Sequence, residues 1–573
     1  MSLEPPSPTA QGRTSTLLLC AGGMRLGALP IATASSNAMV PLNGRPVLAW
    51  ILDDLARKGV QEAVVVRRDN DQQLAAFLGR AYSRNMAVRQ AVVPALGGSI
   101  VRSLAAGLAA APEAVEVRVV LGDTLIEDPL DPSDDFVYVG HTQEPDRWCV
   151  AALDEDGQIA VLHDKQFLPG RDHLALAGYY RFADAALLRA CVDEVLAAGG
   201  RELSAVLHAY RAKRPLRALT VSSWFDFGNV DNYARAKLHL LRPRFFNAVQ
   251  IDPVLHTLTK RSTKLDKLRD EVGWYQALPP ELKVLAPRLL GDGTEGAAAE
   301  QPVGWYTIEY YGYPTLADLY VWGELDLDVW LSILRRVLEV HARLAAVPGA
   351  LSTDDIWSML YDKTHERLAE LRRMHPEWQT LLEAETLLLN GRRLRNVAAL
   401  APALEAALRD LVASARPSFI HGDLCFSNIL FDVPSQIVRL IDPRGSFGAR
   451  GPVGDPRYDL AKLRHSVCGG YDLLQADFFA VEELAPSEFT VQVWRPEVSQ
   501  RLARQFDEVL RDAGHDPRQV QLIESLLFLS MPPMHEGHAD RQRAMYLYGL
   551  SLLNEVLVPD AATDKEPADA HLH

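Results

Sequence analysis

His421-Gly-Asp423-Leu-Cys-Phe-Ser-Asn428 precedes Ile441-Asp442-Pro-Arg-Gly445 in this chain, with two short apolar runs between them. The runs, residues 429–431 and 437–441, predict the two strands of a hairpin. Asp423 and Asn428 then lie on the loop before the first strand, and Asp442 lies at the end of the second. Chemistry on Mg-ATP needs oxygen ligands for the metal and a carboxylate near the attacking hydroxyl. The spacing therefore favours a phosphoryl-transfer site.

The pattern resembles the aminoglycoside phosphotransferase and choline kinase family, whose signature is His-Gly-Asp, an Asn five residues after the Asp, and then Ile-Asp. The resemblance implies a two-lobed, protein-kinase-like α+β domain. It also implies that Asp423 is the catalytic base and that Asn428 and Asp442 hold Mg²⁺. The alternative is that the two aspartates only cap turns.

A kinase of this type needs a lysine for the nucleotide phosphates and a glutamate that holds this lysine in place. An extended segment reaching Thr259 delivers Lys260, and a helix beginning near Leu265 delivers Glu271. We assign the pair to these two residues, with Lys264 as the competing lysine. A solvated, lysine-rich helix start would look similar.

The segment from Tyr306 to Leu316 reads as a strand that turns into a helix. By the resemblance it is the hinge, with Glu309 at the position where the backbone faces adenine. The small lobe carries no Gly-x-Gly-x-x-Gly loop, which suits this family better than the protein kinases.

Asp455 and Asp459 lie in Gly454-Asp-Pro-Arg-Tyr-Asp459, which predicts a helix start. Asp455 is expected to cap this helix; by the resemblance, the alternative is that the aspartates here brace the catalytic loop or border the substrate pocket. Both interpretations stay open.

The N-terminal half begins with an apolar run, residues 16–20, that breaks into a glycine-rich turn. Such a turn exposes backbone N–H groups to phosphate, and an arginine adds positive charge. The residues concerned are Ala21, Gly22, Gly23 and Arg25.

Three further blocks follow in order: Ser36 to Leu48, Val119 to Asp123, and Trp224 to Tyr233. With the first turn they resemble the nucleotidyltransferases that activate sugar phosphates and phosphocholine. The resemblance implies that the first turn, with Arg25 as a catalytic residue, cradles a nucleoside triphosphate, and that Asp123 and Asp226 bind catalytic Mg²⁺. It also implies that Lys165 contacts the phosphorylated substrate.

Asn37 departs from this family, which places a lysine four residues before the proline of that block. Lysine there stabilises charge on the α-phosphate, whereas asparagine donates a hydrogen bond without charge. Unless Arg25 or Arg45 substitutes for the lysine, losing such a contact costs ~10²–10³ in rate. The glycine turn is also shorter than usual. The domain is therefore either an active nucleotidyltransferase with altered chemistry or a degenerate domain that binds nucleotide.

Strands and helices alternate through the N-terminal half, which predicts a Rossmann-like α/β domain with a mixed, mainly parallel sheet. The expected helices are 47–58, 100–110 and 232–240, and the expected strands include 63–66 and 115–121. We expect this domain at 14–243 and the kinase-like domain at 244–559. Its small lobe should span about 244–320, with the loop 291–300, and its helical large lobe about 321–559. Residues 1–13 and 560–573 are expected to be disordered tails.

Length and composition agree with two catalytic modules, because a chain of 573 residues is longer than a domain with a single hydrophobic core. The net charge of −15 argues against a nucleic-acid partner. Five scattered cysteines suit a reducing compartment, and Cys425 is expected to be loop packing. No run approaches the roughly 20 apolar residues of a membrane span. We expect a cytoplasmic protein, and the sequence gives no indication of its oligomeric state.

These features together predict a bifunctional enzyme acting on small molecules. The kinase would phosphorylate a hydroxylated metabolite with Mg-ATP, and the transferase would couple a phosphorylated metabolite to a second NTP, with CTP favoured. Fusions of this type resemble proteins of bacterial capsule and surface-polysaccharide synthesis. The alternative is a monofunctional kinase whose N-terminal domain is a regulatory nucleotide binder.

Overall fold

The chain divides into two compact units, Met1–Leu240 and Leu241–His573, in the computed structural model. The residues that the structure describes are 14–21, 36–42, 44–80, 86–131, 135–170, 172–227, 233, 236, 247–295, 302–323, 325–374 and 376–558. The expected tails, the expected helix 232–240 except for two of its residues, and residues 241–246 lie outside these ranges.

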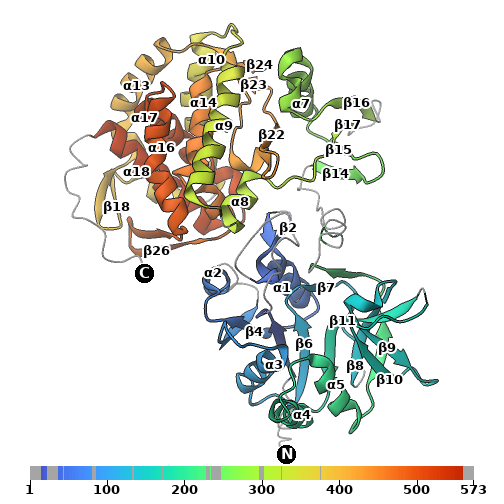
Figure 1. Ribbon diagram of the computed structural model, residues 1–573. Helices are drawn as coiled ribbons and strands as arrows, with labels where there is room; N and C mark the ends of the chain where they lie inside the picture. The colour runs from blue at the N-terminus through green and yellow to red at the C-terminus, as the bar shows by residue number, and fades with distance from the viewer. Residues whose placement is uncertain are drawn as a thin grey trace, which may run out of the picture. The chain divides into compact units, whose positions relative to one another are not determined.

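The N-terminal unit is built on a nine-stranded mixed sheet (Figure 1). Seven strands follow one another as β10-β9-β11-β6-β1-β4-β5, while β8 pairs with β11 and β12 pairs with β8. The strands in chain order are β1 (Thr14–Leu19), β4 (Glu62–Arg68), β5 (Ala87–Val93), β6 (Glu116–Leu121), β8 (Phe136–Thr142), β9 (Cys149–Leu153), β10 (Ile159–Asp164), β11 (His173–Phe182) and β12 (Arg217–Thr220). This confirms the predicted mixed α/β sheet.

The half of the sheet from β6 to β5 is parallel, with β1 between β4 and β6. Leu17 and Leu19 of β1 belong to one hydrophobic core, and Leu18 between them is equally buried. Because side chains alternate along a strand, both faces of β1 are covered. The carboxyl ends of β1 and β6 therefore share one edge, where Asp123 follows β6.

Helices cover this sheet, and they lie close to their predicted places. The helices are α1 (Val47–Arg57), α2 (Gln72–Arg80), α3 (Ile100–Ala109), α4 (Ala185–Ala197) and α5 (Leu203–Arg211). Buried residues of α3, α4 and α5 join one core with β1 and β6. A separate pair of short antiparallel strands, β7 (Thr124–Ile126) and β13 (Trp224–Asp226), lies beyond the end of β6.

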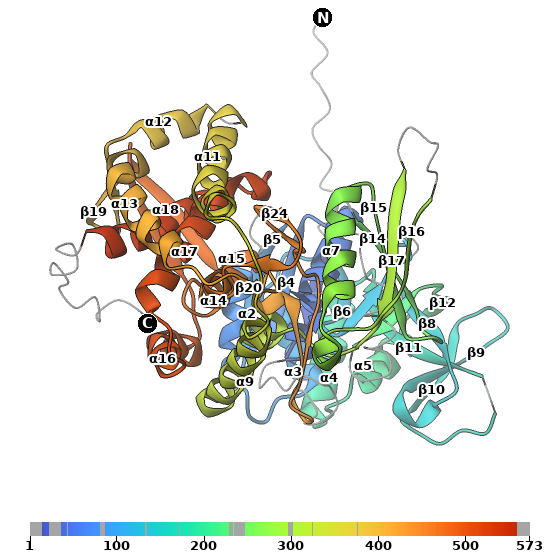
Figure 2. The same cartoon turned by 90° about the horizontal axis from the view of Figure 1, so that it is seen from above.

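The C-terminal unit begins with a small lobe of four antiparallel strands in the order β14-β15-β17-β16. The helix α7 (Leu265–Ala277) lies along this sheet (Figure 2). The strands are β14 (Asn247–Asp252), β15 (Thr257–Ser262), β16 (Leu289–Glu295) and β17 (Val303–Glu309). The hydrophilic segment 291–295, expected to be loop, is part of edge strand β16, since main-chain pairing with β17 decides its structure. Residues 296–300 lie outside the described ranges.

The large lobe is mainly helical, as the sequence predicted (Figure 1). Its helices are α8 (Leu316–Trp322), α9 (Leu327–Ala345), α10 (Thr353–Trp357), α11 (Lys363–Met374), α12 (Glu377–Glu383), α13 (Val397–Ala413), α14 (Pro456–Val467), α15 (Tyr471–Gln475), α16 (Glu497–Asp512), α17 (Pro517–Ser530) and α18 (Ala539–Leu557). The expected hairpin is present as β21 (Ile429–Asp432) and β22 (Ile437–Leu440), which pair antiparallel. No described helix of the chain is long and apolar enough to cross a bilayer.

A four-stranded sheet in the large lobe was not predicted, because the sequence after Asp326 was interpreted as helical. Its order is β19-β18-β27-β26, with strands β18 (Thr386–Leu389), β19 (Arg392–Arg395), β26 (Phe479–Ala485) and β27 (Glu488–Val493). Several of its residues are charged and exposed, so the alternation that marks a strand is weak.

Candidate functional sites

Asp423 lies on the loop before β21 with both carboxylate oxygens engaged. Asn428 Nδ2 donates to Asp423 Oδ2 and to the Asp423 carbonyl, each at 2.9 Å. Lys462 Nζ, from α14, forms an ion pair with Asp423 Oδ1 at 2.9 Å. Burial raises the pKa of Asp423, but Lys462 outweighs burial and holds it below its ordinary value. Asp423 is therefore ionised and oriented, with 37% of its side chain exposed.

The backbone of this loop is held by Asp459 of α14. Asp459 Oδ2 accepts from the His421 N–H at 2.7 Å, and Oδ1 accepts from the Gly422 N–H at 2.8 Å. His421 Nε2 donates to the Ile441 carbonyl at 3.1 Å, and burial lowers the His421 pKa to about 4. A neutral imidazole thus joins the His-Gly-Asp loop to the strand end that carries Asp442.

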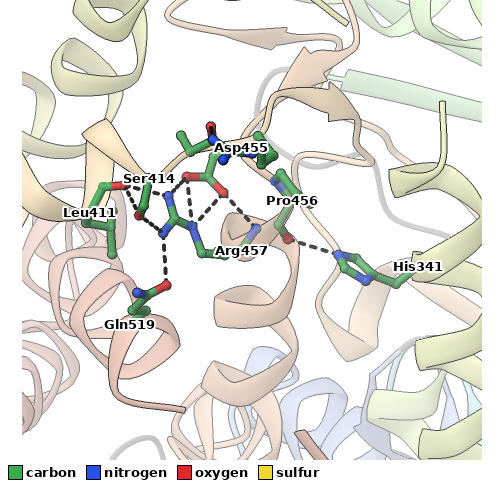
Figure 3. Close-up of polar contacts among 9 residues, drawn as sticks. His341, Leu411, Ser414, Asp455, Pro456, Arg457 and Gln519 are labelled. Atoms are coloured by element: carbon green, nitrogen blue, oxygen red, sulfur yellow. Dashed lines mark hydrogen bonds and ion pairs between the residues drawn. The ribbon is translucent and has the colours of Figure 1, made fainter. Parts of the chain in front are cut away.

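Asp455, whose role the sequence left open, caps α14 (Figure 3). Its Oδ1 accepts from the Arg457 N–H at 3.0 Å, and Arg457 Nη2 pairs with its Oδ2 at 2.6 Å. Arg457 reaches on to Ser414, Gln519 and the Leu411 carbonyl. The bracing role thus belongs to Asp459, while Asp455 fixes the start of the helix that carries it.

Lys260, in β15, meets Glu271 of α7 as the sequence predicted. Lys260 Nζ lies 2.7 Å from Glu271 Oε2 and 3.0 Å from Asp442 Oδ1. The Tyr306 hydroxyl donates to Glu271 Oε2 at 3.0 Å. Burial lowers the pKa of Lys260, but the two carboxylates outweigh it and raise the pKa, so the ammonium stays charged. Lys264, the competing lysine, is exposed at the N-cap of α7.

The oxygen-bearing side chains in this region suit Mg²⁺. Asp442 has a φ of 51°, a left-handed conformation that sets its carboxylate at the turn after β22, and 41% of its side chain is exposed. Asn428 adds an amide oxygen on the neighbouring loop. In the described part of the chain no three His, Cys, Asp or Glu side chains gather as a metal cage. Mg²⁺ does not need one, because it commonly takes one or two carboxylates with water and substrate phosphates.

Glu309 ends β17 and leads into the segment before α8. Its carboxylate accepts from the Arg288 N–H and the Tyr311 hydroxyl, each at 3.0 Å. Its own N–H donates to the Arg288 carbonyl, and the Tyr310 N–H donates to the His256 carbonyl. Both N–H groups are therefore engaged within the protein, and the hinge role of Glu309 stays a prediction.

Asp123 and Asp226 are brought together by the short ladder beyond the main sheet. Asp226 pairs with Thr124, and the Phe227 N–H donates to the Asp123 carbonyl at 2.9 Å. Burial raises the pKa of the Asp123 carboxyl, opposed by a hydrogen bond from Asn37 Nδ2 to its Oδ2 at 3.1 Å. Asn37, which replaces the family's lysine, thus contacts one of the two expected metal ligands.

The other predicted site residues of this unit have no described contact with Asp123 or Asp226. Lys165 is exposed, with a φ of 49°, and its Nζ lies 3.9 Å from Glu202 Oε2 at the N-cap of α5. Ala21 is partly buried against the core at the end of β1. Gly22, Gly23 and Arg25 lie outside the described residues. The phosphate-binding role of this turn stays a prediction.

The chain is similar to known proteins of two kinds. Residues 249–495 match the model of the phosphotransferase enzyme family. The chain is also 25% identical over 300 residues to a glucose-1-phosphate thymidylyltransferase of Streptomyces griseus, an alignment that covers 48% of this chain and 78% of that protein. The chain joins a nucleotidyltransferase domain to a phosphotransferase domain. The predicted class of enzyme, a transferase of phosphorus-containing groups, is confirmed.

Solved structures with some similarity include a putative glucose-1-phosphate thymidylyltransferase from Bacillus anthracis in complex with a sucrose. It is 17% identical with a TM-score of 0.36, over 41% of this chain and 97% of that chain. HddC from Yersinia pseudotuberculosis, complexed with GMP-PN, is 17% identical with a TM-score of 0.30, over 39% of this chain and 97% of that chain.

Sequence reasoning assigned no role to Lys462, which pairs with Asp423. The sequence feature that could have indicated this role is the position of Lys462 three residues after Asp459 on α14, since residues three apart share a helix face. Cys425 is 4% exposed, and burial raises the pKa of its thiol to about 12, which agrees with the expected packing role.

Proposed function

We propose that the C-terminal domain transfers the γ-phosphoryl group of Mg-ATP to a hydroxyl of a small metabolite. One observation carries this proposal: Lys260 of the small lobe pairs with Asp442, and Asn428 holds Asp423 on the catalytic loop. A main-chain hydrogen bond from the Ile441 N–H to the Asn428 carbonyl, at 3.0 Å, joins the two pairs into one series. The series contains a phosphate-binding cation, two oxygen ligands and an ionised base, which are the parts that phosphoryl transfer requires.

Each residue has one task in the proposed step. Lys260 balances charge on the α- and β-phosphates, and Glu271 holds it there. Asp423 accepts the proton of the acceptor hydroxyl while its oxygen bonds to the γ-phosphorus and the bond to ADP breaks. Asn428 and Asp442 would hold Mg²⁺, which neutralises charge on the phosphates when bound. Lys462 and Asn428 keep the Asp423 carboxylate in one orientation.

The N-terminal domain would couple a phosphorylated metabolite to a second NTP, with release of pyrophosphate. Asp123 and Asp226 would bind Mg²⁺. Asp226 ends β13 and Asp123 directly precedes its partner strand β7, which supports a shared site. The turn Ala21 to Arg25 would cradle the triphosphate, and Lys165 would contact the phosphorylated substrate.

The two reactions form a chemical sequence, because a kinase product is the kind of substrate that a nucleotidyltransferase takes. The final product would be an NDP- or CMP-activated metabolite for surface polysaccharide or capsule synthesis, with CTP favoured as the second nucleotide. The site of action would be the cytoplasm, where both nucleotides are available. The described cysteines are all free, which agrees with that compartment.

A second candidate is a kinase whose N-terminal domain only binds nucleotide. Asn37 favours it, because the amide donates to Asp123 and supplies no charge for the α-phosphate. Pyrophosphate release decides between the two: the intact protein is incubated with each NTP and a panel of phosphorylated metabolites. Release that disappears in Asp123→Asn supports the bifunctional enzyme, and its absence for every pair supports the binder.

Asp423→Asn tests the kinase. Turnover of a verified acceptor should fall ~10²–10⁴-fold, because the amide cannot accept the proton. Pyrophosphate release should not change, and Asp123→Asn should leave kinase turnover unchanged in return. Near-wild-type phosphorylation by Asp423→Asn would contradict the kinase assignment. Because Lys462 loses its partner, a thermal melt of the variant must accompany the assay.

A further inference from the structure

Lys363 is a cation near the catalytic aspartate and forms no ion pair with any carboxylate in the described part of the chain. It begins α11, directly after a π-helical turn at Ser358–Asp362, a local distortion that often marks functional sites. Its Nζ lies 3.5 Å from the Tyr458 hydroxyl and 5.9 Å from the centre of that ring. Tyr458 and Lys462 are four residues apart on α14, so Lys363 and the partner of Asp423 lie on the same face of that helix.

Arg444 is a second cation near Asp423. Its N–H donates to the His421 carbonyl at 3.0 Å, and a Cβ on Gly422 would come within 2.7 Å of the Arg444 Cβ. The arginine side chain thus starts directly beside the His-Gly-Asp423 loop. Its Nε is buried without a hydrogen-bond partner.

The positive charges around Asp423 exceed the negative charges available to them. Lys462 pairs with Asp423, and Arg367 pairs with Glu370 at 2.6 Å. Among the described residues, no carboxylate lies within 4.0 Å of a charged nitrogen of Lys363 or Arg444. Burial holds the pKa of Lys363 well below its ordinary value, Arg444, Lys462 and Arg367 lower it further, and the charge of Asp423 opposes them without outweighing them.

Such an arrangement is unfavourable without a ligand. A partly desolvated cation is normally retained only when it is paired, and unpaired charge in a site is a common mark of ligand recognition. Both cations adjoin the loop that presents Asp423, but the Asp423 carboxylate forms its ion pair with Lys462. A negatively charged group placed between them would remove their mutual repulsion.

We propose that Lys363 and Arg444 recognise a carboxylate or phosphate group on the acceptor whose hydroxyl Asp423 deprotonates. The inference rests on the proposed kinase function and narrows its substrate class to anionic metabolites. It excludes choline and ethanolamine as preferred acceptors, because their cationic nitrogen would meet two positive charges. The γ-phosphate of ATP is also an anion that these two cations could bind. The experiment must therefore separate binding of the acceptor from binding of ATP.

The first arm uses acceptors in matched pairs, D-glucuronate with D-glucose and D-glycerate with glycerol, at saturating Mg-ATP. Products are identified by mass for the wild type, Lys363→Met and the control Lys283→Met, which removes an exposed lysine from the same unit. The acidic member should be preferred, and Lys363→Met should raise its KM ~10-fold or more, the usual size of one charge-assisted contact, with KM for ATP unchanged. Preference for the neutral member, or a raised KM for ATP alone, overturns the proposal.

The second arm does not depend on turnover. Sulfate is added to the intact protein saturated with the non-hydrolysable analogue AMP-PNP and Mg²⁺, and thermal unfolding is recorded. Sulfate should raise the Tm of wild type and Lys283→Met more than that of Lys363→Met, while general salting-out affects all three equally. Equal shifts overturn the proposal even when no acceptor of the panel is phosphorylated.

Failure of the kinase itself is distinguishable from failure of this inference. If no acceptor reacts but the sulfate effect depends on Lys363, the anion site stands and the proposed reaction is in doubt. Lys363→Gln, which keeps a polar side chain, replaces Lys363→Met if circular dichroism shows that the latter is misfolded.

Discussion

At the scale of single residues, Asp423 combines two properties that oppose each other. A general base is most effective with a pKa near the working pH, yet Lys462 holds the pKa of Asp423 below its ordinary value. The ion pair therefore contributes orientation and constant ionisation, not basicity. In phosphoryl transfer with a loose transition state, the proton leaves late, so a weak but well-placed base is sufficient.

Replacement of Lys462 tests this interpretation. Lys462→Met keeps the volume but removes the charge, so the pKa of Asp423 should rise. Between pH 4 and 6 the acid limb of the kcat profile should move to higher pH, and turnover at pH 7 should fall by ~10–10² through lost orientation. The profile is measured by ADP release, with Lys283→Met as the control. An unshifted acid limb in Lys462→Met would show that the ion pair does not set this pKa.

The sequence predicted the residues that carry local signatures and missed those defined by contacts through space. Asp423, Asn428 and Asp442 follow from spacing, and the Lys260–Glu271 pair follows from a strand next to a helix. The contact of Asp459 with the Gly422 N–H joins residues 37 positions apart. No local pattern fixes which of two nearby aspartates on one helix start will reach the loop.

At the scale of elements, α7 is fastened to the turn that follows Asp442. Gly445 has a φ of 67°, and a Cβ there would lie 1.9 Å from the Asp270 carbonyl oxygen. Arg450 Nε also pairs with Asp270 Oδ1 at 2.8 Å. Glu271 directly follows Asp270 in α7. The contacts of Gly445 and Arg450 with Asp270 therefore set the distance between Glu271 and the turn after Asp442.

Gly445→Ala should therefore displace α7 and disturb the Lys260–Glu271–Asp442 contacts. The left-handed φ alone costs about 1 kcal/mol for alanine, and overpacking adds roughly 1–3 kcal/mol. Gly391→Ala is the matched control, because Gly391 has a φ of 76° and open space around its Cβ position. Thermal unfolding should show a larger loss of stability for Gly445→Ala, and ATP turnover should fall ~10²-fold in that variant only, as misplaced catalytic groups predict. Equal effects of the two substitutions would mean that the close approach to α7 is unimportant.

Most elements were predictable because their apolar patterns are strong. The helices α1, α3 and α7 and the hairpin β21–β22 begin within a residue or two of their expected positions. The sheet β19-β18-β27-β26 consists of two local hairpins, and the pairing that joins them, of Leu388 with Glu488, spans a long sequence separation that no local pattern predicts. Its polar, exposed strands leave little alternation to detect.

At the scale of the whole molecule, each unit places its site where one element ends and another begins. In the N-terminal unit Asp123 follows a parallel strand, and in the C-terminal unit Asp442 follows a hairpin. The sequence predicted this division because each unit has its own set of motifs. It could not predict the charge balance around Asp423, because that depends on side chains from α11, α14 and the Asp442 turn.

The C-terminal unit should lose stability in mild acid because buried imidazoles hold it together in their neutral form. His341 of α9 donates from Nε2 to the Pro456 carbonyl at 2.9 Å, at the start of α14 (Figure 3). Burial lowers the pKa of His341 and of His421 to about 4, from an ordinary value of 6.5. Between these values the unfolded chain binds protons that the folded unit does not, so the free energy of unfolding falls as pH falls from 6.5 to 4.

Each of these histidines should lower the free energy of unfolding by on the order of 3 kcal/mol by pH 4, because a shift of one pKa unit corresponds to about 1.4 kcal/mol. His341→Gln keeps a hydrogen-bond donor but cannot be protonated, so its unfolding free energy should depend less on pH by roughly that amount. The measurement is urea unfolding at pH 7, 6, 5 and 4, with hydrogen exchange reporting peptides of residues 249–558. His538→Gln, at an exposed histidine of the same unit, should keep the wild-type slope. If His341→Gln keeps it as well, the neutral contact between α9 and α14 is not a source of the acid sensitivity.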